Sequence, residues 1–434
     1  MKISQVIKRS QTAKLMSWLF VDKDNDVFEN SKLIQFLSKI SNEKLAIIFL
    51  ALSFVCLWYE SFFSSVGIRF VEGFNFAIIF LFLSFIFCDK KRLKLTKAMT
   101  FLLLFVMVLL ISGLWAGICG LAIAMIISGI FLFCQFVLAF VISSTFRAKN
   151  TVINLLLLIS IPLLLVGCYQ GLSGQTTSRL WVSTAENLVQ ARAFGFFGSP
   201  NILGGLAMIT VIIAVSKFLS LKKWWYLVYG IIALLALVLT FSRSAWIGLG
   251  VGIAAALLIK NWKLIFISPL VLLALIVPSI KQRIFVSLSQ SYMIDAALDG
   301  RVWSFNTAME IFKTSPIIGT GPGTYGGQTA IYFNSPVYLR GIQNGYVALP
   351  YTDNQWLQIA VQTGILGLIT IVGFFISHLV NNLKRYFKTH EYLYLGVVAA
   401  TIALLINGLF ANVLEFGAVS ILGGVYLGLG NYHE

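Results

Sequence analysis

The chain has 434 residues, of which 59% are hydrophobic and only 11% are charged, and its formal net charge is +16 at pH 7. Soluble globular domains carry about 25% charged residues. This composition therefore excludes a water-soluble globular protein and indicates an integral membrane protein.

Apolar runs recur along the chain from residue 45 to its end. At roughly 17 to 25 residues each, they can cross a hydrocarbon core of about 30 Å as helices. We expect an all-α polytopic membrane protein with about twelve transmembrane helices. The predicted spans are residues 45–63, 70–88, 98–115, 119–144, 151–169, 200–216, 224–241, 245–259, 264–280, 355–377, 393–409 and 414–430.

Residues 1–44 form a polar arm that is rich in Lys and Arg and lacks an apolar core of signal-peptide type. We expect this arm to be a cytoplasmic N-terminal segment, and residues 45–434 to form a single transmembrane domain whose first span is retained as an anchor. With this orientation, most of the 32 Lys and Arg residues fall in the arm or in short inner loops, which is the positive-inside pattern. Topology explains the net charge, so no nucleic-acid partner is predicted.

Two predicted outer segments are long, namely residues 170–199 and the extracytoplasmic loop 281–353 before the tenth span. Loops of this length are usually functional or disordered. In the second, apolar residues at helical spacing predict an amphipathic helix that lies flat at the membrane interface. These residues are Val302, Phe305, Met309 and Phe312, with Trp303 beside them.

A proline and a run of glycines follow this predicted helix. Pro316 ends the helix, and the segment Gly319–Gly323 turns the chain sharply. The glycines invite comparison with a phosphate-binding loop, but the Gly-Lys-Ser/Thr ending of such loops is missing. A nucleotide site is therefore not expected here.

Four polar features interrupt the otherwise apolar outer side. They are Arg192 before Phe194–Asn201, Arg243 within Phe241–Ser244, Asp299-Gly300-Arg301, and Thr352-Asp353-Asn354. Arg243 lies where only a few residues separate two spans, so its guanidinium must sit at the bilayer edge. A charge at such depth is costly and predicts a functional site. Other interpretations stay open: the arginines could be solvated or reach the lipid headgroups, and Asp353 could cap the tenth span.

The residue types at these positions suit phosphate chemistry. Arginine stays protonated, and its planar guanidinium binds phosphate oxygens through two parallel hydrogen bonds. A nearby carboxylate can take a proton from an attacking hydroxyl as a general base. Together they fit transfer from a lipid-diphosphate donor to a sugar hydroxyl. The three histidines are predicted on the inner side, and the five cysteines show no metal-ligand spacing, so we expect no metal.

Three motifs together resemble the O-antigen ligase and polymerase superfamily over about residues 190–380. They are Ser242-Arg243-Ser244, then Gly300-Arg301 with Trp303 leading to Pro316–Gly323, and Asp353-Asn354-Gln355-Trp356-Leu357 through Gly364–Gly367. The resemblance implies a C-type glycosyltransferase-like membrane fold that acts on an undecaprenyl-diphosphate-linked glycan without a metal ion, nucleotide sugar or other cofactor. It also implies roles at the diphosphate for Arg243 and Arg301. Ligases of the family carry a histidine where this chain has Asp353.

We therefore expect an O-antigen or exopolysaccharide polymerase of the Wzy type in the bacterial cytoplasmic (inner) membrane, with an extracytoplasmic active site. The expected catalytic residues are Arg243, Arg301 and Asp353. The expected substrate-binding residues are Arg192, Asn201, Asn354, Trp303 and Tyr325.

The expected partners are the undecaprenyl-diphosphate-linked oligosaccharide as both donor and acceptor, the lipid bilayer, a chain-length regulator and a flippase. One alternative function is a ligase that moves a finished glycan to a lipid or protein acceptor. The other is a flippase or transporter of lipid-linked glycans. A transporter is expected to place polar groups along a path through the membrane, whereas the predicted spans are nearly free of charge.

Overall fold

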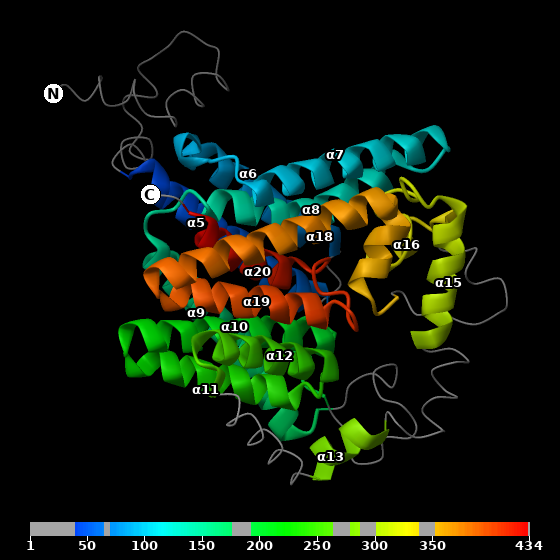
Figure 1. Cartoon of the computed structure of the whole chain (residues 1–434). Coiled ribbons are helices and arrows are strands. Elements are labelled where there is room, and N and C mark those ends of the chain that lie inside the picture. The colour runs from blue at the N-terminus through cyan, green and yellow to red at the C-terminus, as the bar shows by residue number, and fades with distance from the viewer. Residues whose placement is uncertain are drawn as a thin grey trace, which may run out of the picture.

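A computed structural model describes residues 40–64, 70–175, 192–263, 278–286, 301–337 and 352–432. Every regular element within these ranges is a helix. The longer helices lie side by side in one bundle, with α15 and α16 at one end and the C-terminus at the other (Figure 1). We call these two ends the α15 end and the basic end, because the connections at the second carry many of the lysines and arginines.

The long helices of the bundle are α5 (Asn42–Ser64), α6 (Phe70–Phe87), α7 (Lys97–Ile118), α8 (Ile123–Ser143), α9 (Lys149–Ser173), α10 (Pro200–Leu221), α11 (Trp224–Leu239), α12 (Arg243–Lys260), α18 (Gln355–Thr389), α19 (Tyr392–Asn407) and α20 (Gly417–Asn431). The short elements are η1 (Lys90–Arg92), α13 (Pro278–Phe285), α15 (Arg301–Thr314) and α16 (Gly327–Tyr332).

Each predicted span except residues 264–280 coincides with one of the long helices. That span lies mostly outside the described residues, as does most of the arm 1–44 and much of the loop 281–353. Among the described helices, six are long and apolar enough to cross a membrane, and four shorter ones are apolar. The all-helical, polytopic character is thereby confirmed. The number of twelve spans, the single domain over 45–434 and the C-type glycosyltransferase-like fold stay predictions.

Local sequence signals set several helix ends. The hydroxyl of Thr96 accepts a hydrogen bond from the backbone nitrogen of Met99 at 3.2 Å, which caps the start of α7. Pro200 occupies the first turn of α10, where its missing N–H costs nothing. Helix α9 ends at Gly174 in the left-handed conformation, which glycine adopts without steric strain.

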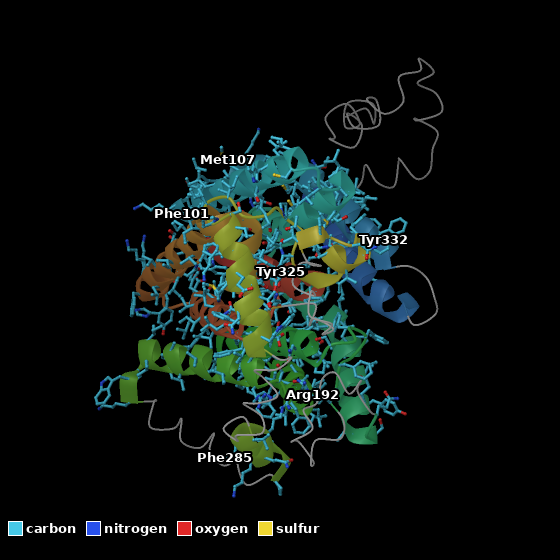
Figure 2. All side chains as sticks on the ribbon, turned by 90° about the vertical axis from the view of Figure 1, so that its right-hand side faces the viewer. Phe101, Met107, Arg192, Phe285, Tyr325 and Tyr332 are labelled. Carbon is cyan, nitrogen blue, oxygen red and sulfur yellow. The ribbon has the colours of Figure 1, made fainter. Side chains whose placement is uncertain are left out.

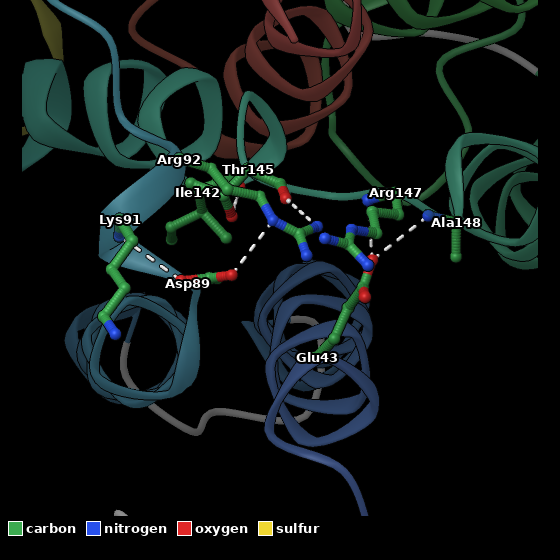
Figure 3. A network of polar contacts seen from close by, with 8 residues as sticks. All are labelled: Glu43, Asp89, Lys91, Arg92, Ile142, Thr145, Arg147 and Ala148. Carbon is green, nitrogen blue, oxygen red and sulfur yellow. Dashed lines mark hydrogen bonds and ion pairs between the residues drawn. The ribbon is translucent and has the colours of Figure 1, made fainter. Parts of the chain in front are cut away.

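Polar contacts at the basic end hold three parts of the chain together (Figure 3). The carboxylate of Glu43 accepts hydrogen bonds from the backbone nitrogens of Arg147 at 2.6 Å and of Ala148 at 3.1 Å. Arg92 forms an ion pair with Asp89 at 2.9 Å and donates to the carbonyl of residue 145 at 3.4 Å. The connection between α8 and α9 is thus held to the start of α5 and to the segment after α6.

Helix α18 is broken at Gly364, where φ is 68° and ψ is −173°. The segment 316–321 fills the break with its own backbone. Its hydrogen bonds with α18 are Thr320 N to Val361 O at 2.9 Å, Gly321 N to Gln362 O at 2.9 Å, Ile365 N to Pro316 O at 2.9 Å and Leu366 N to Ile317 O at 3.3 Å. Peptide groups that the helix leaves unpaired at the break thus find partners, as an apolar surrounding requires.

The glycines of the segment Gly319–Gly323 allow this close packing. A Cβ added to Gly319 would lie 2.4 Å from the carbonyl carbon of Gln362. On the opposite side, a Cβ added to Gly129 of α8 would lie 2.2 Å from the backbone nitrogen of Gly323. The sharp turn predicted from these glycines is present, with positive φ at Gly319, Gly321 and Gly323. It serves the contact of this segment with α8 and α18.

Replacing Gly364 with Ala is expected to destabilise the protein. The new Cβ would lie 2.1 Å from the carbonyl oxygen of Ile317, at a φ that L-residues rarely adopt. Such strain and overpacking cost about 1 to 3 kcal/mol, so thermal unfolding in detergent should show a lower midpoint. Gly250→Ala in α12 is the matched control, because its added Cβ would meet no atom within 4 Å beyond the neighbouring backbone of its own helix. Equal midpoints for the two variants would contradict the packing at the break.

Helix α15 runs across the α15 end of the bundle (Figure 1), and it ends before Pro316 as predicted. Its Ala308 and Ile311 are buried in a small cluster that includes Leu357 and Val361 of α18. On the other side of α15, Val302 and Phe305 are exposed. The predicted helix therefore exists and packs on α18. Contact of its exposed apolar side with the membrane interface stays a prediction.

Candidate functional site

Three arginines gather on the turn between α11 and α12. The Nε of Arg192 donates to the carbonyl of Thr240 at 2.9 Å, and its Nη2 donates to the carbonyl of Phe241 at 3.5 Å. The Nε of Arg283 in α13 donates to the same Phe241 carbonyl at 3.1 Å. Arg243 donates from Nη1 to the carbonyl of Arg283 at 3.1 Å. We call Arg192, Arg243 and Arg283 the arginine cluster.

The turn itself is built to hold these contacts. Phe241 has a positive φ of 49°, which directs the chain from α11 back into α12 within a few residues. The hydroxyl of Ser242 donates to the Oδ1 of Asn201 at 3.0 Å, and the Nη2 of Arg192 donates to the same atom at 3.4 Å. Asn201, in the first turn of α10, therefore joins Arg192 to the turn.

The arginine cluster is cationic and largely shielded from solvent. Arg192 is 3% and Arg283 is 5% exposed, and Arg243 is half-buried. Helix α12 begins at Arg243, so the partial positive charge of its N-terminus adds to that of the guanidinium groups. Charges interact more strongly in such surroundings than in water, which favours a ligand with more than one negative charge.

The entrance to α18 carries the predicted carboxylate. Asn354 caps the helix, because its Oδ1 accepts a hydrogen bond from the backbone nitrogen of Leu357 at 3.0 Å. Asp353 precedes the cap, is half-buried and has a φ of +49°. The alternative that Asp353 caps this helix is therefore wrong: the cap position, with its extended backbone, belongs to Asn354, and Asp353 stands one residue outside it.

Beneath this entrance lies a buried polar network that the sequence analysis missed. The Nε2 of Gln358 donates to Glu415 Oε2 at 2.7 Å, and the backbone nitrogen of Leu414 donates to Gln355 Oε1 at 2.9 Å. The Nε2 of Gln362 donates to the carbonyl of Tyr325 at 2.7 Å. The signal that could have found this site is the single acidic residue at the start of the otherwise apolar run 413–430.

The first turns of α10 connect the arginine cluster to the entrance of α18. A Cβ on Gly204 would lie 3.0 Å from the Cβ of Ser242, and a Cβ on Gly205 would lie 3.3 Å from the side chain of Val413. The segment 408–416 is joined in turn to α18, because the backbone nitrogen of Gln355 donates to the carbonyl of residue 408 at 2.8 Å. Both groups of residues therefore lie at the α15 end, which faces the viewer in Figure 2.

The remaining predicted residues are placed in different ways. Arg301 begins α15, but its side chain lies outside the described part of the structure, as do Asp299 and Gly300. Trp303 is half-buried on α15. Tyr325 is buried against α15 and α18, and its hydroxyl donates to the carbonyl of residue 304 at 3.5 Å.

The structure thus brings Arg192, Asn201 and Arg243 together and adds Arg283, which the sequence analysis did not single out. Asp353 and Asn354 lie at the same end of the bundle, on α18. The position of the Arg301 side chain relative to either group lies outside the described part of the structure.

These observations define an all-helical, multi-pass membrane protein with an arginine cluster and a carboxylate at one end of its bundle. Residues 228–372, from α11 into α18, match the family model described as O-Antigen ligase. The resemblance to the O-antigen ligase and polymerase superfamily is therefore confirmed, over a segment that includes Arg243, Arg301 and Asp353. The match supports a function of the O-antigen ligase or polymerase type. No curated protein matches the chain.

Proposed function

We propose that the chain polymerises undecaprenyl-diphosphate-linked oligosaccharide repeat units into a surface polysaccharide. The observation that carries this proposal is the arginine cluster on the turn 240–243, inside the segment that matches the O-antigen ligase family. Guanidinium groups bind phosphate oxygens through paired hydrogen bonds. The diphosphate that joins lipid to sugar in such a donor has the charge that this cluster suits.

In the proposed reaction, a hydroxyl of one lipid-linked unit attacks the anomeric carbon of another. A glycosidic C–O bond forms while the bond from the anomeric carbon to the diphosphate oxygen breaks. Undecaprenyl diphosphate leaves with the electron pair, and the hydroxyl proton passes to Asp353 as general base. Arg243 and Arg301, with Arg192 and Arg283, stabilise the leaving diphosphate without any reorganisation of solvent.

The other residues have supporting roles in this proposal. Asn201 orients the guanidinium of Arg192, and Asn354 fixes the turn that presents Asp353. Trp303 and Tyr325 line the sugar side from α15 and its following loop. The bilayer holds the polyprenyl chains beside the exposed apolar faces of the helices, while a flippase supplies the repeat units and a chain-length regulator limits the product.

One further candidate is a ligase, because the matched family model carries that description. A ligase would use the same donor and the same diphosphate contacts, but it would transfer the finished glycan to a lipid or protein acceptor. Asp353 in place of the histidine of the family's ligases favours the polymerase.

The deciding experiment supplies purified protein in nanodiscs with a lipid-linked repeat unit as the only substrate. We expect a ladder of products that differ by one repeat, together with released undecaprenyl diphosphate. Transfer that starts only after a separate lipid or protein acceptor is added would establish the ligase instead. Movement of intact lipid-linked units across a proteoliposome membrane, without bond cleavage, would overturn both enzymatic proposals.

The proposal places the α15 end outside the bacterial cytoplasmic membrane and the basic end in the cytoplasm. In a cysteine-free variant, a cysteine replacing the exposed Tyr332 of α16 should react with an impermeant maleimide in intact cells. One replacing Lys222, exposed at the basic end, should react only after the cells are permeabilised. Removal of native Cys119 is essential to this design, because it is exposed. The reverse labelling pattern would contradict the orientation.

A further inference from the structure

Glu415 is a carboxylic acid buried inside the bundle at the α15 end. It lies in the segment 408–416 between α19 and α20, and its side chain is 6% exposed. Its Oε2 accepts a hydrogen bond from Gln358, whereas its Oε1 has no partner among the described residues. Burial of a carboxyl group is costly unless it is compensated, and in a membrane protein such a group is by default a candidate for function.

The carboxylate sets the direction of the hydrogen bonds around it. The Nε2 of Gln358 points toward Glu415, whose Oε2 accepts this hydrogen bond whether the carboxyl group is ionised or neutral. The Oε1 of Gln358 is thereby left to accept from the Nδ2 of Asn412. Gln355 joins the same network, since its Oε1 accepts from the backbone of Leu414. One acidic side chain thus orders the amides that bind the segment 408–416 to the first turns of α18.

This network lies directly behind the turn that presents Asp353. Gln355 follows the cap Asn354, and its backbone nitrogen is bonded to the carbonyl of residue 408. Gln358 also contacts the glycine-rich loop, where a Cβ on Gly326 would lie 2.8 Å from the Gln358 amide. A change in the orientation of the Gln358 amide would therefore act on the entrance of α18 and on the loop after α15 together.

We propose that Glu415 is a positioning residue for the acceptor half of the reaction. It acts through Gln358 and Gln355 on the turn that carries Asp353 and touches no substrate itself. The inference rests on the proposed function. It deepens that function, because Glu415, in the segment 408–416, would hold the general base Asp353 in place from a different part of the fold.

The test uses Glu415→Met, which keeps the length of the side chain but removes the oxygen that accepts the hydrogen bond from Gln358. Hydrogen exchange of purified protein in nanodiscs should show amides 354–358 exchanging at least about tenfold faster than in wild type. On lipid-linked repeat units, kcat should fall about tenfold to a hundredfold, as expected for a misplaced catalytic group, while KM for the donor stays unchanged. Glu310→Met on the exposed side of α15 is the matched control and should change neither quantity.

A double-mutant cycle with Asp353→Asn separates positioning from a general structural role. If Glu415 acts through Asp353, Glu415→Met should cost little further activity in the Asp353→Asn background. Equal losses in both backgrounds, or unchanged exchange at 354–358, would overturn the proposal. Should Glu415→Met fail to fold, Glu415→Asp, too short to reach Gln358, takes its place with the same expected results. If wild type transfers no sugar, the proposed function fails, while the exchange measurement still decides whether Glu415 orders this turn.

Discussion

Replacing Asp353 with Asn is expected to slow glycosyl transfer by about a hundredfold to ten-thousandfold, which is the usual contribution of a general base. The substitution removes the proton acceptor and keeps the size of the side chain. Asn adopts the left-handed conformation found at this residue about as readily as Asp. The helix start also survives, because the cap is Asn354. Initial rates of purified wild type and variant, compared across pH, give the measurement.

Asn354→Ala is the matched control, because it removes the cap and leaves the carboxylate. Loss of an N-cap costs about 1 kcal/mol, so this variant should show a lower thermal midpoint and a smaller loss of rate than Asp353→Asn. Wild-type rates in Asp353→Asn would remove the base from the proposed mechanism. Catalysis would then rest on the arginines and on substrate positioning.

Hydropathy predicted the bundle well because each span is a long apolar run. In lipid, the backbone N–H and C=O groups of such a run must form hydrogen bonds with each other, which only a helix allows within one segment. Helix starts with a local signal were also predictable, as at Pro200. The end of α18 was not: the predicted span stops at residue 377, whereas the helix continues to Thr389. A transmembrane helix need not end where its apolar run ends, since polar residues can extend it beyond the bilayer.

The break in α18 shows what the sequence could not reveal. Glycine at position 364 is compatible with a continuous helix, and only the docked segment 316–321 makes the break stable. Arg283 and Glu415 are similar cases, because their importance lies in contacts with Phe241 and Gln358, far away along the chain. Local patterns identified Arg243 and Asp353 through charge in an apolar setting, but partners from distant elements required the fold.

Arg243→Lys is expected to be the other severe variant, although it keeps the positive charge. A lysine ammonium is a compact point charge, so it cannot form the two parallel hydrogen bonds that a guanidinium makes to a diphosphate. The single ammonium group would also have to serve both the diphosphate and the carbonyl of Arg283, to which Arg243 now donates. Loss of one preorganised donor to a developing anion typically lowers kcat about a hundredfold to a thousandfold.

Arg283→Lys provides a graded comparison within the same cluster. Its Nε is bonded to the carbonyl of Phe241, so lysine would lose both that bond and the alignment of the remaining N–H groups. Polymer would be measured by gel laddering at matched membrane expression, with Arg147→Lys, exposed at the basic end, as the control. Near-normal polymer from both cluster variants would mean that these arginines only stabilise the turn. A cation with a structural role needs only its charge and a side chain long enough to reach its partner, whereas a diphosphate site needs the planar, paired geometry of the guanidinium.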